Sequence, residues 1–67
     1  MSKEARLREA LVKWFEEVYE AYNRNNIFAL MLKNMAVDMF RRVISTVNLA
    51  DYTRELYLIL KEYFEGG

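Results

Sequence analysis

Residues that break helices are missing from the interior of this chain. The sequence contains no proline, and its two glycines are the last two residues, Gly66 and Gly67. Because proline and glycine interrupt helices most strongly, backbone chemistry alone ends no helix before residue 66. Turns must therefore be marked by polar residues. Two stretches qualify: residues 23–26, which contain three asparagines, and residues 45–48, which read Ser-Thr-Val-Asn.

These two turns predict three helices, at about residues 3–22, 26–46 and 49–65, followed by a Gly66-Gly67 tail. Each segment repeats its apolar residues at the helical period, with charged residues opposite in the first and third. Asn48 can cap the third helix, and Asp51 can complete a capping box with it. Because short connections favour antiparallel neighbours, we expect an all-α fold: one domain over residues 1–67, built as an up-down-up antiparallel three-helix bundle.

The middle helix is more apolar than one neighbouring helix requires. Its apolar side chains cover an arc of about 220°, interrupted only by Lys33. Contact with two neighbouring helices explains part of this arc, but it leaves some of the apolar side chains without a partner. Leu30, Val37 and Ile44 recur every seven residues at one edge of the arc, beside Lys33 and Arg41, which is the spacing of a helix-helix seam. We predict that these five residues form an interface; coverage of the stripe by the third helix is the alternative.

The composition excludes most catalytic chemistry. Cysteine and histidine are both absent, which removes the usual ligands of zinc, haem and copper and the usual nucleophile-base pairs. No glycine-rich phosphate loop is present. The carboxylates of the first and third helices line faces that we interpret as solvent-exposed. We therefore expect no enzyme activity, no cofactor and no metal site.

Charge argues against two classes of partner. Ten basic and ten acidic side chains give a net charge of zero, whereas nucleic-acid and membrane-surface binders usually carry a basic excess. The middle segment, residues 24–48, is mildly basic, and the segments before and after it are acidic. The longest apolar run, residues 27–32, is too short to span a bilayer, and the first residues lack a signal-peptide core. We expect a cytoplasmic protein.

Several features of the sequence resemble computationally designed helical mini-proteins. These are the start MSKEARLREAL, the lack of cysteine, histidine and proline, charge pairs four residues apart such as Glu4 with Arg8 and Asp38 with Arg42, and the Gly66-Gly67 end. The resemblance implies a stable scaffold or binder without biological activity of its own. Turns without glycine and four methionines depart from that pattern, and they fit either a natural protein or a surface made apolar to bind a target.

Three functions remain open on the sequence. The first, which we favour, is a non-enzymatic module that binds a protein partner or its own copy through the apolar middle helix. The second is a stable monomeric scaffold without a partner. The third is a binder of small apolar ligands, which would occupy a gap in the bundle core among Trp14, Phe28, Met35 and Met39.

Overall fold

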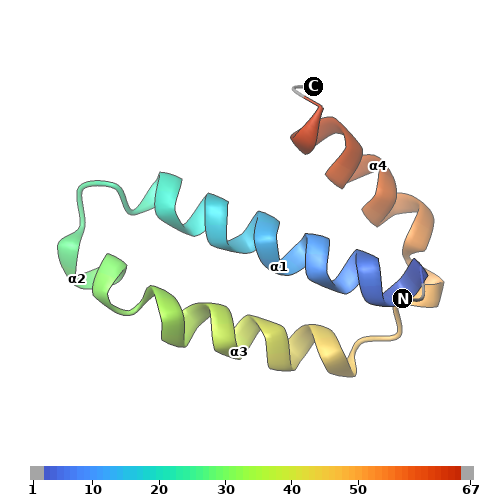
Figure 1. Cartoon of the computed structure of the whole chain (residues 1–67), viewed down its shortest axis with the longest axis horizontal. Helices are drawn as coiled ribbons and strands as arrows, with labels where there is room; N and C mark the ends of the chain where they lie inside the picture. Colours follow the sequence, from blue (N-terminus) through green and yellow to red (C-terminus); the bar gives the residue numbers. More distant parts are fainter. Residues whose placement is uncertain (1–2, 66–67) are drawn as a thin grey trace.

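The computed structural model describes residues 3–65, and all of its regular elements are helical (Figure 1). The elements in chain order are α1 (Lys3–Tyr22), α2 (Ile27–Met31), α3 (Lys33–Thr46), the 3-10 turn η1 (Leu49–Asp51) and α4 (Thr53–Phe64). The predicted all-α class is confirmed. The predicted Gly66-Gly67 tail lies outside the described residues.

The first turn is built by asparagines, the residue type that marked it in the sequence. The backbone and side-chain amides of Asn23 both donate to the carbonyl of Tyr19, at 3.1 and 2.8 Å, and so close the last turn of α1. Asn26 then starts α2, because its side-chain oxygen accepts the amide proton of Ala29 at 3.1 Å. Asparagine suits both positions, since its short polar side chain satisfies backbone groups that the helix ends leave open.

The single helix expected over residues 26–46 is interrupted at Leu32, and this part of the prediction was wrong. The Leu32 amide donates to the carbonyl of Ala29, three residues back, at 3.1 Å. That same carbonyl also accepts the hydroxyl proton of Tyr19 at 2.6 Å. A side chain from α1 therefore occupies an acceptor that a continuous helix would offer to Lys33, and inserted groups of this kind are a known cause of helix kinks.

The third predicted helix also begins differently. Residues 49–51 form η1, and α4 starts only after Tyr52, which supplies no side-chain cap. Asn48 therefore precedes a 3-10 turn rather than capping an α-helix, and its side-chain amide lies 3.4 Å from the carboxylate of Asp51. Short 3-10 turns are common at helix ends because they satisfy backbone groups with bonds between residues three apart.

Helix α1 is the central element of the fold. It packs against α3 along one side and against α4 along another, whereas α3 and α4 make almost no contact with each other. Figure 1 shows α1 and α3 side by side, with α4 starting near the N-terminal end of α1 and running at a steep angle to it. The helix packing expected from the sequence is present, but α4 does not cover α3.

The buried core is small and lies where the three helices meet. Its central cluster is formed by Leu11 from α1, Leu49 from η1 and Leu60 from α4, and Val12 of α1 is buried as well. Half-buried apolar side chains pack around the cluster: Leu7, Ala10, Trp14, Phe40, Ile44, Val47 and Leu56. Between α1 and α3 the rings of Phe15 and Phe40 stack at 4.4 Å with an interplanar angle of 8°. Arg8 joins the same two helices, because its guanidinium donates to the carbonyl of Ile44 and pairs with Glu4 at 2.6 Å.

Candidate functional site

The two basic residues of the predicted interface, Lys33 and Arg41, reach across to α1. The Lys33 ammonium lies 2.5 Å from the Glu20 carboxylate and 3.7 Å from that of Glu16. Arg41 pairs with Glu9 at 2.9 Å. The opposite charges of the first and middle segments are thus brought together as ion pairs between α1 and α3. The carboxylate of Glu20, as hydrogen-bond acceptor, raises the pKa of Lys33 above its ordinary value.

The three apolar residues of the predicted seam are half-buried. Ile44 packs against the buried cluster of Leu11, Leu49 and Leu60. Leu30 and Val37 are partly covered. Val37 shares the face of Ile44, which follows it by seven residues on α3, whereas Leu30 belongs to α2. This edge of α3 is the side from which Lys33 reaches α1. Lys33, Val37, Arg41 and Ile44 therefore lie on the side of α3 next to α1, whereas Leu30 lies on α2, before the break at Leu32.

A second apolar face runs along the outside of α2 and α3. Five side chains spaced four residues apart, each between 58% and 76% exposed, form a row that we call the outer stripe: Ile27, Met31, Met35, Met39 and Val43. Phe28, at the start of α2, is similarly exposed. Residues four apart form one of the two ridge systems by which helices pack. Met35, Met39 and Val43 form such a ridge on α3, and Ile27 and Met31 precede it on α2. The high exposure of all five shows that no helix among residues 3–65 covers them.

Helix α4 packs against α1 and leaves the outer stripe uncovered. In a closed three-helix bundle, the third helix covers both of its neighbours. Here α4 buries Leu60 against α1 but leaves its other apolar flank, including Ile59 and Tyr63, exposed. Desolvation and the nearby carboxylate of Glu17, which belongs to α1, raise the pKa of Tyr63. α4 is thus packed mainly against α1.

The side chains proposed for a ligand gap are dispersed in the structure. Trp14 packs against the buried cluster, whereas Phe28, Met35 and Met39 lie at the surface. The sequence signal for the outer stripe was the width of the apolar arc of the middle helix. Spacing alone did not tell which part of that arc would face α1.

Three further findings bear on the function of the chain. Across residues 3–65 no group of acidic side chains gathers closely enough to hold a metal ion. None of the described helices combines the length and apolar character required to cross a bilayer. Comparisons with protein-family models, with curated proteins and with solved structures give no match. What stands out is the uncovered apolar ridge of α2 and α3.

Proposed function

We propose that this chain is a non-catalytic association module whose outer stripe binds a second copy of the same chain. The observation that carries the proposal is the row of five apolar side chains, 58% to 76% exposed, along α2 and α3. Single exposed apolar residues are ordinary on protein surfaces, but a contiguous row marks a surface used for association.

The size of the surface supports this function. With Phe28 added, the row presents six large apolar side chains over α2 and α3. Standard protein interfaces bury about 800 Å² on each partner, and the largest apolar patch of a typical monomer is about 300–600 Å². A patch of six large apolar side chains, each more than half exposed, is comparable in size to the largest apolar patches of typical monomers. Three of the six are methionines, whose flexible thioethers adapt to a partner surface.

The charge of the chain favours its own copy as partner. A net charge of zero means that two copies do not repel each other as a whole. Asp38 and Arg42, which pair with each other at 3.1 Å, lie on α3 beside the stripe. In a two-fold arrangement the same patch meets itself, so that each acidic group can face the basic group of the other copy. Ridges with four-residue spacing also interdigitate in the commonest helix-crossing class.

The proposal also includes the order and direction of the helices. We take it to be up-down-up, with α1 and α3 antiparallel and α4 returning along α1. The short connections and the packing of α1 against both other long helices support this. In the associated state the second copy supplies the cover on α3 that α4 leaves open.

The experiment is light scattering coupled to size exclusion over a concentration series. We expect the mass of the wild-type chain to rise above the 8.1 kDa of one chain with concentration. Met39→Glu places a charge in the middle of the stripe, where desolvation opposes it, and should give a folded monomer. Asn34→Glu, at an exposed site of α3 outside the stripe, is the matched control and should associate like the wild type.

Val37→Glu tests the seam predicted from the sequence against the outer stripe. If Val37 belongs to the packing of α1 with α3, the variant should lose helical circular dichroism, because a charge is then buried without a partner. A folded, monomeric Val37→Glu would instead favour the seam of Leu30, Val37 and Ile44. A wild-type chain that stays at 8.1 kDa throughout the series would contradict self-association and favour a monomeric scaffold.

A further inference from the structure

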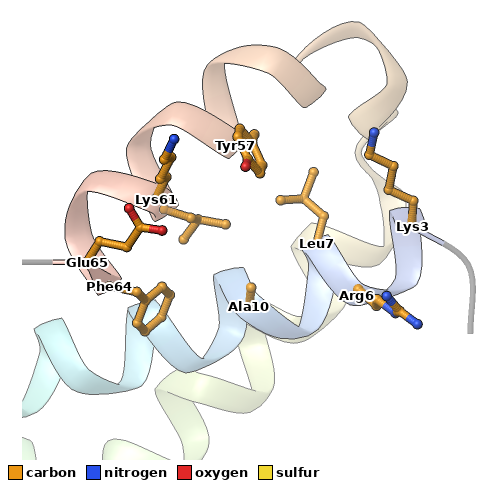
Figure 2. Close-up of a pocket in the computed structure, with 9 residues that line it drawn as sticks. Lys3, Arg6, Leu7, Ala10, Tyr57, Lys61, Phe64 and Glu65 are labelled. Carbon is orange, nitrogen blue, oxygen red and sulfur yellow. The ribbon is translucent and has the colours of Figure 1, made fainter.

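A groove separate from the outer stripe lies between the first half of α1 and α4 (Figure 2). Its volume is about 350 Å³, at the lower end of the range of small-molecule sites. Its lining residues come from both helices and from the residue after α4: Lys3, Arg6, Leu7, Ala10, Tyr57, Leu60, Lys61, Phe64 and Glu65.

The interior of the groove is apolar. Leu7 and Ala10 of α1 and Leu60 of α4 form its base, and they also belong to the packing around the core. Figure 2 shows the side chains of Leu7 and Tyr57 turned toward each other across the space between the helices, with Phe64 at the other end. Such a lining favours an apolar chain, because every methylene placed there leaves water.

The charged residues of the groove are mostly basic. Lys3, Arg6 and Lys61 are cationic, and Glu65 is the one anionic residue among the nine that line it. The ion pairs seen within residues 3–65 involve Arg8, Lys33, Arg41 and Arg42, and none of the three cations of the groove. Within the described residues none of the three is held in an ion pair, so all three are available to a ligand in the groove.

Two further features increase the positive potential at this site. The ammonium of Lys13 lies 5.9 Å from the centre of the Phe64 ring, at the Phe64 end of the groove. Lys3 and Arg6 belong to the start of α1, where the amides of the first turn leave a partial positive charge. The end at the start of α1 therefore favours an anionic group, and at the Phe64 end the two cations Lys13 and Lys61 outnumber the one anion, Glu65.

We propose that this groove binds a free single-chain alkyl carboxylate, with its alkyl chain against Leu7, Ala10 and Leu60. The carboxylate lies at the rim, where Lys61 or the cations at the start of α1 meet it. Charge-assisted hydrogen bonds of this kind are stronger than neutral ones and fix the orientation of the headgroup. The site is distinct from the outer stripe, so it can be occupied whether or not the chain associates.

The test is isothermal titration calorimetry with dodecanoate below its critical micelle concentration. Tyr57 and Leu58 are neighbours on α4 with almost equal exposure, 55% and 54%, but only Tyr57 lines the groove. Tyr57→Asp should weaken binding about tenfold or more, because it places an anion on the apolar wall. Leu58→Asp is the matched control and should bind like the wild type. Circular dichroism checks that both variants keep their helices.

Two further binding experiments test whether the groove recognises the negative charge of the headgroup. Dodecyltrimethylammonium has the same alkyl chain with the opposite charge, and we expect it to bind about tenfold more weakly or not at all. Lys61→Glu should weaken dodecanoate binding, whereas Arg54→Glu, the same charge change on α4 outside the groove, should not. Equal affinities for the two amphiphiles would overturn the carboxylate preference.

The monomeric Met39→Glu variant separates this site from the proposed association surface. Dodecanoate binding should be unchanged in it. Loss of binding in Met39→Glu would place the amphiphile on the outer stripe and overturn the assignment to the groove. The assignment would also fail if Tyr57→Asp and Leu58→Asp bound equally well. Binding to phosphatidylcholine vesicles without binding to free dodecanoate would show that the surface recognises a lipid bilayer instead.

Discussion

Leu49 is the residue whose truncation should reveal most about how this chain holds together. Its side chain is 1% exposed and lies in η1, between α3 and α4 in the sequence. It meets Leu11 of α1 and Leu60 of α4 in the buried cluster. Leu49→Ala therefore removes the apolar contact that fixes the connection between α3 and α4 to the central helix.

The expected loss is comparable to the whole stability of the chain. Replacing a fully buried leucine by alanine costs about 2–5 kcal/mol, from lost transfer energy and from the cavity that remains. A domain of fewer than about 70 residues rarely has more than about 3–5 kcal/mol available from a single core. With a urea m-value of about 1 kcal/mol/M for a small protein, the midpoint of unfolding should fall by about 2 M or more.

The assay is urea unfolding followed by circular dichroism at 222 nm, with all variants in the Met39→Glu background so that association does not add to stability. Leu58→Ala is the matched control, because it deletes the same atoms from a side chain that is 54% exposed. We expect Leu58→Ala to shift the free energy of unfolding by no more than about 0.5 kcal/mol. Equal midpoints for Leu49→Ala and Leu58→Ala would refute the assignment of the core.

Two further predictions concern polar contacts between α1 and α3. Arg8→Lys should cost about 1 kcal/mol in urea unfolding, because lysine cannot donate to the carbonyl of Ile44 and pair with Glu4 through separate nitrogens as arginine does; an unchanged midpoint would contradict this role. Lys33 has a raised pKa in the folded chain, so its contribution to stability is complete below its ordinary pKa of 10.5 and is lost as the pH rises through the folded value. The difference in urea midpoint between the wild type and Lys33→Gln should therefore be constant from neutral pH up to 10.5 and shrink above it, and a difference that does not change above pH 10.5 would show that the pairing with Glu20 does not stabilise the fold.

The helical class and the first turn could be predicted from sequence because local chemistry determines them. The apolar period of residues 3–22 gives one face to bury, and asparagines at 23 and 26 supply the groups that close one helix and open the next. These signals lie within a few residues of the structure they specify. They need no knowledge of which helix packs against which.

The break at Leu32 and the docking of α4 depend on contacts between distant residues. Leucine is not a residue type that ends helices, so the sequence gives no sign of a break at Leu32. The hydrogen bond that competes for the carbonyl of Ala29 comes from Tyr19, on a different helix. For α4, the wide apolar arc of α3 and the apolar face of α1 were equally suitable partners by periodicity. The choice follows from how Leu49 and Leu60 fill the space beside Leu11.

The sequence predicts that the middle helix has more apolar surface than its neighbours cover, but it does not predict where on the helix the uncovered surface lies. The apolar arc of the middle helix shows from the sequence that more surface exists than one neighbour covers, and the outer stripe is part of that surface. The position of the excess depends on the angular setting of α3. That setting is fixed by the stack of Phe15 with Phe40 and by the ion pair of Arg41 with Glu9, neither of which is local in sequence.

The attachment of α4 mainly to α1 has a consequence for how the native chain fluctuates. A helix that shares almost no surface with α3 can detach without disturbing the α1–α3 hairpin, whose ring stack and ion pairs stay in place. Sub-global opening of this kind requires less free energy than complete unfolding. Backbone amides of α4 should therefore exchange with solvent through a lower-energy opening than those at the centre of α1, and a protease should reach the segment from η1 to α4 while the hairpin is still folded.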